Sequence, residues 1–366
     1  MTHIQLQNVT VTLAGGGREI KALDDVTLAV RSGEVMGVIG PTGCGKSTLL
    51  RAVSGLLPLA SGKVLFDGQD QAKVPARERG IGMVFQDYAL YSHWKVRENL
   101  SFYFRLRKRE AEAPEHIREA AAILGVDFSY LLGKFPSTLS DGQRQQVAIA
   151  RCLVRDPRVF LMDEPFSNLD ASQRQHARVQ LKRLLQRFRV TTFYVTHDQE
   201  EAAALCDRVA FMDAGRIWQV DTFRNLLVWP KSLRVADFVT QPGTHFIEGA
   251  VMEGHFACPQ FSLPLTPAVL ARTSPGQAVT ARIPPLSVSL ADGESPAFRG
   301  AVEWIEPLPM HRAQRITCSA GAVKLSVELS QQHAVQIGDV LALAIDPDEV
   351  QIFDTRTGAN LATARL

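Results

Sequence analysis

The segment Gly40–Ser47 constrains the fold more than any other part of this 366-residue chain. It fits the pattern G-x-x-x-x-G-K-[ST] with the residues Gly40, Pro41, Thr42, Gly43, Cys44, Gly45, Lys46 and Ser47. An apolar run over 35–39 precedes it and a helical pattern over 47–53 follows, which is the context that the pattern requires. Backbone N–H groups of such a loop, and the helix N-terminus, attract a polyphosphate. The segment therefore predicts a nucleoside-triphosphate site, with Lys46 at the β- and γ-phosphates and Ser47 on Mg²⁺.

Length and composition limit the number of domains and the classes of function that the chain can have. A chain of 366 residues is too long for one average domain and suggests two or three. The formal net charge of +2 gives no argument for nucleic-acid binding. Five scattered cysteines without metal-binding spacing favour a reduced, cytosolic compartment. No signal-peptide pattern and no apolar run of about 20 residues occurs, so any membrane crossing is expected from another chain.

The pattern of apolar runs predicts two domains. Residues 1–235 alternate buried strands with amphipathic helices, as in an α/β domain with a largely parallel sheet. Between about 87 and 155 helices replace the strands, which indicates a helical insert. Residues 236–366 predict a smaller β-rich domain. The strands expected in the two domains are 35–39, 81–85, 159–162, 192–195 and 209–212, and then 278–283, 300–305, 323–327 and 340–345.

Two carboxylates follow the apolar run 159–162. Asp163 suits Mg²⁺, and Glu164 would stand beside the γ-phosphate, where a general base polarises the attacking water. A carboxylate pair is a common ending for a strand without catalytic meaning. Its register with the phosphate loop favours the catalytic interpretation here.

Further motifs bring in a family resemblance. The run Leu139-Ser140-Asp141-Gly142-Gln143 resembles the LSGGQ signature of ABC-type ATPases, although Ser140 alone would predict only a helix N-cap. Gln86 after its strand resembles the Q-loop of that family. Ser167-Asn168-Leu169-Asp170 resembles the D-loop, and Thr196-His197-Asp198 resembles the switch-histidine segment. The wider sequence around these motifs is similar to ATPase subunits of carbohydrate importers of the maltose/glycerol-phosphate type.

The resemblance implies a P-loop NTPase ABC cassette, with a RecA-like core and a helical insert, followed by an OB-like regulatory domain. In such cassettes Glu164, His197 and Gln86 would be catalytic, and Ser47, Gln86 and Asp163 would serve Mg²⁺. ATP would contact Gly40, Pro41, Thr42, Gly43, Cys44, Gly45, Lys46, Ser47 and Thr48 of one subunit, and Ser140, Gly142 and Gln143 of the opposite subunit. Two subunits would then close around two ATP molecules.

The resemblance also implies a function and partners. The chain would hydrolyse ATP to power uptake of a sugar, polyol or glycerol-phosphate-type solute from the cytoplasmic face of the membrane. Its partners would be an identical or different second ABC ATPase, two integral-membrane permease subunits and an extracytoplasmic solute-binding protein, with no nucleic acid. Residues 88–94 would form part of the groove for the permease. A polyamine, iron or oxyanion importer shares these motifs, whereas a nucleic-acid-linked ABC ATPase would carry a long coiled coil or a basic face.

Three positions depart from the family pattern. Leu13 stands where an aromatic residue usually stacks on adenine, and no Phe, Tyr or Trp precedes Phe66. Asp141 replaces a signature glycine, and we expect its side chain to face solvent, away from phosphate. Gln146 stands where an arginine is usual. None of these changes removes a catalytic atom, but weaker base discrimination follows from Leu13.

Overall fold

The computed structural model describes residues 2–15, 18–125, 128–291 and 297–362. The chain divides into two compact units, Met1–Asn225 and Leu226–Leu366, a division that falls ahead of the boundary at 235 suggested by the sequence. In the described ranges, none of the helices combines the length and the apolar character that crossing a bilayer requires.

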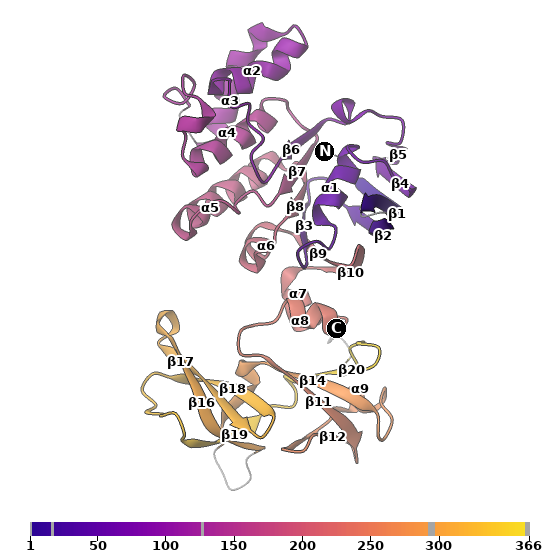
Figure 1. The fold of residues 1–366 in the computed structure, drawn as a ribbon, viewed down its shortest axis with the longest axis vertical. Coiled ribbons are helices and arrows are strands. Elements are labelled where there is room, and N and C mark those ends of the chain that lie inside the picture. The colour runs from indigo at the N-terminus through magenta and orange to yellow at the C-terminus, as the bar shows by residue number, and fades with distance from the viewer. Residues whose placement is uncertain (1, 16–17, 126–127, 292–296, 363–366) are drawn as a thin grey trace. The chain divides into compact units, whose positions relative to one another are not determined.

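A six-stranded sheet forms the centre of the first unit (Figure 1). Its order is β10-β9-β3-β8-β7-β6, with parallel pairs throughout except at the antiparallel edge strand β10. All five residues of β3 are buried, as expected for a parallel strand covered on both faces. The five strands predicted for this sheet are confirmed. The strands are β3 (Val35–Ile39), β6 (Ile81–Val84), β7 (Val159–Asp163), β8 (Thr191–Val195), β9 (Arg208–Asp213) and β10 (Arg216–Asp221).

One face of this sheet packs against helix α1 (Lys46–Ser54) and a second, antiparallel sheet. Leu49 and Val53 of α1 share a core with Met36 and Phe193 of the parallel sheet. The antiparallel sheet has the order β2-β1-β4-β5, and the sequence pattern did not distinguish it from the parallel sheet. Its strands are β1 (Ile4–Gly15), β2 (Arg18–Val30), β4 (Ser61–Phe66) and β5 (Gln69–Asp70).

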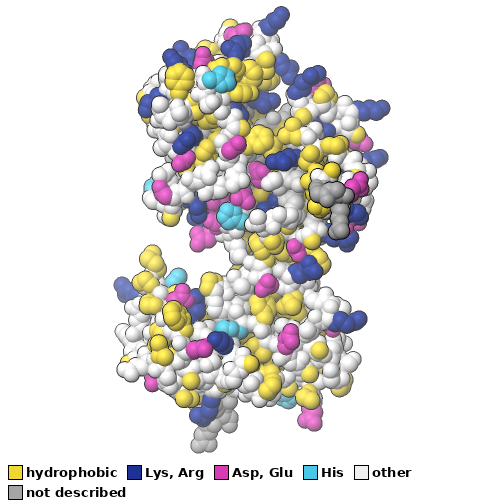
Figure 2. Space-filling view, in the orientation of Figure 1, with side chains coloured by type: hydrophobic (Ala, Val, Ile, Leu, Met, Phe, Trp, Pro, Cys, Tyr) yellow, Lys and Arg dark blue, Asp and Glu magenta, His cyan; other side chains and the backbone are white. Residues whose placement is uncertain are grey.

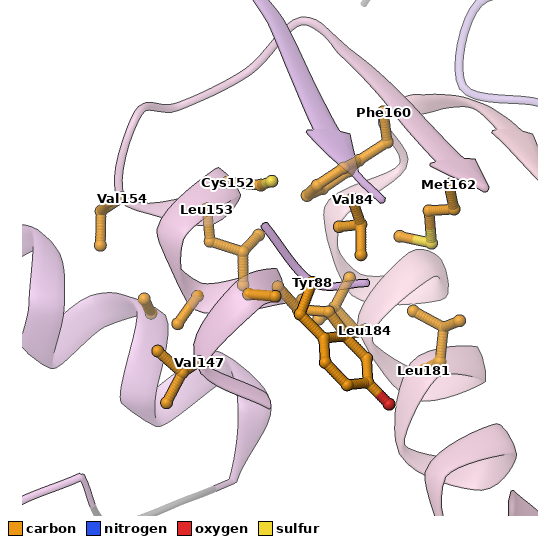
Figure 3. Close-up of a cluster of buried hydrophobic side chains, with 14 of the residues drawn as sticks. Val84, Tyr88, Val147, Cys152, Leu153, Val154, Phe160, Met162, Leu181 and Leu184 are labelled. Atoms are coloured by element: carbon orange, nitrogen blue, oxygen red, sulfur yellow. The ribbon is translucent and has the colours of Figure 1, made fainter. Parts of the chain in front are cut away.

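The opposite face packs against helices, including the predicted helical insert. Figure 3 shows Leu181 and Leu184 of α5 and Val147 of α4 gathered near Tyr88 and the strand residues Val84, Phe160 and Met162. Gly125 ends α3 in the left-handed region (φ 63°), as its position in the sequence predicted. The helices are α2 (Val96–Leu106), α3 (Ala113–Leu124), α4 (Asp141–Leu153), α5 (Ala171–Phe188) and α6 (Gln199–Leu205), with 3₁₀ turns at Ala76–Glu78, Glu110–Glu112 and Pro136–Thr138.

The second unit contains two five-stranded antiparallel sheets, so its predicted β-rich character is confirmed. Their orders are β13-β12-β11-β14-β20 and β15-β19-β16-β17-β18, and Phe256 and Phe298 contribute to their common core. The strands are β11 (His245–Met252), β12 (His255–Ala257), β13 (Ser262–Pro264), β14 (Ala278–Ile283), β15 (Val288–Leu290), β16 (Phe298–Leu308), β17 (Ala313–Ala320), β18 (Val323–Ser330), β19 (Val340–Ile345) and β20 (Gln351–Asp354). The short helices are α7 (Phe223–Val228), within which the division between the units falls, α8 (Leu233–Phe238) and α9 (Pro267–Leu270), with 3₁₀ turns at Pro285–Ser287 and Pro309–His311.

Candidate active site

The phosphate loop joins β3 to α1 in the predicted strand–loop–helix order. Two of its glycines have no room for a side chain. Gly40 has φ 156°, and a Cβ added there would lie 1.9 Å from the carbonyl oxygen of Met212. Gly45 has φ 110°, and its Cβ would lie 2.4 Å from the carbonyl oxygen of Ala22. The neighbouring backbone of β2 and β9 therefore allows only glycine at these positions.

Lys46 begins α1 and its ammonium lies within the loop. The side chain is 7% exposed, and Nζ donates hydrogen bonds of 2.8 Å to the carbonyl oxygens of Gly40 and Pro41. Nζ also lies 3.9 Å from Sγ of Cys44. Burial raises the pKa of the Cys44 thiol, while the nearby Lys46 charge acts in the opposite direction. Because an ammonium has three donors, Nζ can also donate to a further acceptor such as a phosphate oxygen.

Ser47 and Asp163 bring the loop and the end of β7 together. Ser47 Oγ donates a hydrogen bond of 3.0 Å to Asp163 Oδ1. Burial raises the pKa of Asp163, partly offset by the Ser47 hydrogen bond, and the Glu164 charge raises it further. A hydroxyl and a carboxylate oxygen are the hard ligands that Mg²⁺ prefers, so the pair fits that ion. No cluster of three or more His, Cys, Asp or Glu able to hold a metal occurs in the described part of the chain.

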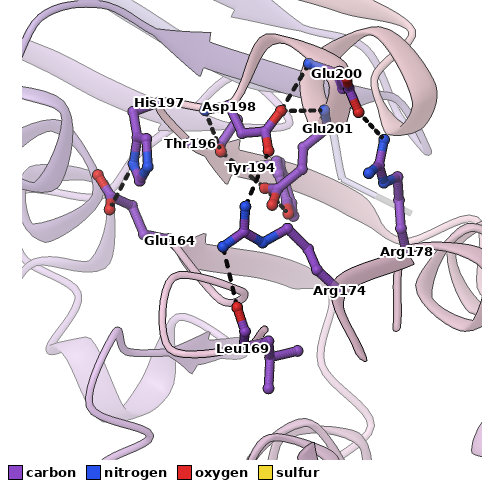
Figure 4. Close-up of polar contacts among 10 residues, drawn as sticks. All are labelled: Glu164, Leu169, Arg174, Arg178, Tyr194, Thr196, His197, Asp198, Glu200 and Glu201. Carbon is purple, nitrogen blue, oxygen red and sulfur yellow. Dashed lines mark hydrogen bonds and ion pairs between the residues drawn. The ribbon is translucent and has the colours of Figure 1, made fainter. Parts of the chain in front are cut away.

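Glu164 and His197 lie side by side at the ends of β7 and β8 (Figure 4). Glu164 Oε2 is 3.0 Å from His197 Nδ1, and the Glu164 N–H donates to the carbonyl of Val195. Glu164 has φ 45°, a strained conformation for a residue with a side chain. Such strain persists only where surrounding structure imposes it, and it is concentrated at active sites. The geometry thus places the predicted base and the predicted switch histidine in direct contact.

Gln86 is exposed in the turn after β6, next to the Ser167–Asp170 segment. Its carbonyl oxygen accepts a hydrogen bond of 3.0 Å from Asn168 Nδ2. Tyr88 and Ala89 follow with φ 63° and 46°, two consecutive strained residues. The structure therefore joins two of the predicted motif segments through the main chain of Gln86.

Ser140, Gly142 and Gln143 form the first turn of α4. Ser140 Oγ accepts from the Gln143 N–H, and Gln143 Oε1 accepts from the Ser140 N–H, so the two residues form a capping box. The predicted N-cap role of Ser140 is confirmed. Asp141 is about half-exposed and paired with Arg144, and Gln146 Nε2 lies 3.4 Å from Gln180 Oε1. Helix α4 packs on the face of the sheet opposite α1, the helix that begins at the phosphate loop.

The sequence reading missed one buried acid beside the switch histidine. Glu201 is 3% exposed, and its Oε2 accepts hydrogen bonds of 2.8 Å from Tyr194 Oη and Thr196 Oγ1. Burial raises the pKa of Glu201, and both hydroxyl hydrogen bonds oppose this rise. No sequence signal distinguished Glu201 from Glu200, because both lie in the first turn of α6, where acidic residues are favoured whether or not they are buried.

Comparisons with known proteins agree with this geometry. A family model described as "ABC transporter" matches residues 23–167. The chain is 39% identical to the sn-glycerol-3-phosphate import ATP-binding protein UgpC of Escherichia coli O157:H7, covering 98% of this chain and 99% of that protein. It is 36% identical to the xylose/arabinose import ATP-binding protein XacK of Haloferax volcanii, covering 100% and 97%.

Solved structures are similar to part of the chain. The dimeric structure of MJ0796, a bacterial ABC transporter cassette, is 30% identical with a TM-score of 0.55, covering 60% of this chain and 99% of that one. A second MJ0796 structure, a dimeric post-hydrolysis state bound to ADP and Pi, has a TM-score of 0.53 at 29% identity, covering 60% and 99%. The fold, the motif geometry and similarity over nearly the whole length agree. The chain therefore belongs to the ABC transporter family, as an ATP-binding and ATP-hydrolysing cassette.

Proposed function

We propose that the chain powers import of a sugar, polyol or glycerol-phosphate-type solute. Similarity over almost the full length to UgpC and XacK, the β-rich unit included, is the observation that carries this proposal. A polyamine, iron or oxyanion importer remains the alternative, because the solute is selected by the partner proteins and not by the ATPase.

In this proposal the loop residues Gly40–Thr48 bind the phosphates of ATP through backbone N–H groups and Lys46. Ser47, Asp163 and Gln86 would hold Mg²⁺, which when bound would neutralise phosphate charge. The Ser47–Asp163 hydrogen bond supports the first two assignments. Glu164 accepts a proton from the attacking water, and such a positioned base contributes roughly 10²–10⁴-fold in rate.

His197 contacts the γ-phosphate while it stays beside Glu164. The Nδ1 atom faces Glu164, so the other ring nitrogen is the one available to a phosphate oxygen. The 3.0 Å separation of His197 Nδ1 and Glu164 Oε2 supports this arrangement. The pair thus links the position of the base to the presence of the γ-phosphate.

A second subunit completes each site with Ser140, Gly142 and Gln143. The location of the signature turn on the face of the sheet opposite the phosphate loop supports this sharing. Closure around two ATP molecules then moves the transporter, and hydrolysis removes the contacts that held the dimer closed.

The membrane partners are two permease subunits that receive solute from an extracytoplasmic binding protein, which places the ATPase on the cytoplasmic face. A groove of about 330 Å³ supports a docking site, with Tyr91, Phe102, Tyr103 and the 67%-exposed Leu106 among its lining. Four arginines, Arg77, Arg107, Arg151 and Arg155, also line this groove. Figure 2 shows basic and apolar side chains gathered over the α2 region of this unit. Aromatic residues and arginine are enriched at protein interfaces.

Glu164→Gln tests the catalytic part of the proposal. We expect turnover to vanish, while ATP binding persists and traps a dimer visible by size-exclusion chromatography. Glu119→Gln, on the 63%-exposed Glu119 side chain of α3, is the matched control and should keep parent activity. Parent turnover in Glu164→Gln would remove Glu164 from its role.

Co-reconstitution tests the solute class. The ATPase, its permease subunits and the binding protein should show ATP hydrolysis stimulated by a sugar, polyol or glycerol phosphate. Stimulation only by polyamines, ferric ion or oxyanions would select the alternative.

A further inference from the structure

Arg174 of α5 contacts two site segments at once (Figure 4). Its Nη2 donates a hydrogen bond of 3.1 Å to the carbonyl oxygen of Leu169, in the segment that follows β7. Its Nη1 lies 3.6 Å from Asp198 Oδ2, in the segment that follows β8. One guanidinium therefore joins the Ser167–Asp170 segment to the residue next to His197.

The β8 end of this bridge is tightly held. Asp198 Oδ1 accepts from the N–H groups of Glu200 and Glu201, at 2.8 and 3.1 Å, and so caps α6. Thr196 Oγ1 accepts from the Asp198 N–H and donates to the buried Glu201. His197 thus lies between two residues whose side chains are fixed, and its contact with Glu164 depends on where they are held.

At the other end of the bridge, the Ser167–Asp170 segment contacts Gln86. Asn168, the neighbour of Leu169, donates to the Gln86 carbonyl, and Asp170 caps α5 by accepting from the Gln173 N–H. The Arg174 N–H in turn donates to the Asp170 carbonyl. Gln86 and His197 are consequently connected within one chain by consecutive contacts that pass through Arg174.

We propose that Arg174 is a positioning residue for ATP hydrolysis, which keeps the Ser167–Asp170 and Thr196–Asp198 segments in register so that His197 and Glu164 act together. This inference rests on the roles given above to Glu164 and His197. A planar guanidinium suits the task because its fork reaches two acceptors at fixed angles, which a lysine ammonium on a flexible stem does not.

The expected effects of losing Arg174 on stability and on rate differ in size, and this difference separates a positioning role from a purely structural one. The Arg174 and Asp198 side chains are 31% and 21% exposed, and such partly exposed ion pairs add little stability. A misplacement of about 1 Å at an active site can cost about 100-fold in rate. Loss of Arg174 should therefore affect turnover far more than it affects folding.

Arg178 offers a matched control on the next turn of α5. Its Nη1 lies 3.2 Å from Glu200 Oε2, so it also joins α5 to α6, and Nε of both arginines is buried without a hydrogen bond. Glu200 is 80% exposed and belongs to no motif segment. Arg178→Gln therefore removes the same charge from the same helix pair without touching the bridge.

The experiment compares Arg174→Gln, Arg174→Lys and Arg178→Gln in the full-length chain by kcat, KM and equilibrium Kd for ATP, and melting temperature. We expect Arg174→Gln to lower kcat at least tenfold with Kd within twofold of the parent, and Arg178→Gln to keep parent kcat. Arg174→Lys should fall between the two, because it keeps the charge but loses the fork. Equal kcat in the two Gln variants, or a loss matched by a lower melting temperature, would overturn the inference, as would full activity in Arg174→Lys.

A double-mutant cycle with Asp198→Asn tests the route. If Arg174 acts through Asp198, the kcat of the double variant should be no more than about threefold below that of Arg174→Gln alone. Losses in kcat that add in free energy would contradict that route. Glu164→Gln distinguishes the two proposals. Continued turnover there refutes the proposed function, whereas a trapped dimer there, together with a normal Arg174→Gln, refutes only the positioning role.

Discussion

The phosphate loop and the switch side of the site are built in different ways. The loop is shaped by backbone: two glycines pressed against neighbouring carbonyls, and an ammonium held by carbonyls of the same loop. The switch side is shaped by side chains from β7, β8, α5 and α6 that meet only after folding. The residues that bind phosphate are therefore contiguous in the sequence, although β2 and β9 restrict the loop, whereas the residues that set the geometry of hydrolysis come from several separate elements.

Gly40→Ala should give the largest effect on stability and ATP binding, because it changes the phosphate loop, whose shape depends on close backbone packing. The new Cβ would lie 1.9 Å from the Met212 carbonyl oxygen, so β9 or the loop must move. We expect a loss of about 3 kcal/mol or more in the free energy of unfolding, with loss of ATP binding. Urea unfolding and equilibrium ATP binding measure the two effects.

Gly43→Ala is the control for that change. Gly43 has φ 79°, but no atom lies within 4 Å of its added Cβ. The alanine therefore costs only the free energy of holding a residue with a Cβ in the left-handed conformation, about 1–2 kcal/mol. If both alanine variants unfold at the same urea concentration, close packing against β9 is not what fixes the loop.

Much of the first half of this comparison could be predicted from the sequence. The parallel strands β3, β7 and β8 are all buried, and β3 and most of β7 appear in the sequence as continuous apolar runs. The antiparallel sheet could not be separated from them, because the pairing of β1 with β4 joins segments that are far apart in the sequence. The contacts of Arg174 could not be predicted from the sequence for the same reason. They depend on the distance between α5 and α6 in the folded chain, which no sequence spacing encodes.

Glu201→Ala should give a moderate effect on the side-chain half. It leaves the buried hydroxyls of Tyr194 and Thr196 without their acceptor. An unsatisfied buried hydroxyl costs about 1–3 kcal/mol, so we expect a loss of about 2–4 kcal/mol in unfolding free energy. Glu201→Gln keeps an acceptor oxygen and should lose less, and a larger loss in the Gln variant would contradict this account.

The same residue predicts a pH dependence. Burial raises the pKa of Glu201, so the folded chain binds its proton more tightly than the unfolded chain does. The destabilisation from ionised Glu201 is fully present above the raised pKa and fades as pH falls toward the ordinary range of a glutamate. Unfolding of the parent and Glu201→Gln between pH 4.5 and 8 should therefore show the variant gaining relative stability as pH rises. A difference that does not change with pH would contradict this sign.

The smallest effect is expected for the preference between ATP and GTP, because the phosphate loop and the switch side of the site contact phosphate and not the base. Leu13 on β1, 38% exposed and paired with Ile20 of β2, lacks the ring that would stack on adenine. We expect ATP and GTP affinities to differ by less than about tenfold, which corresponds to about 1.4 kcal/mol. Leu13→Phe should tighten nucleotide binding by about 0.5–1.5 kcal/mol, whereas Ile20→Phe, its cross-strand control, should not. A parent preference for ATP above tenfold, or equal gains from both phenylalanines, would show that the base is recognised elsewhere in the chain.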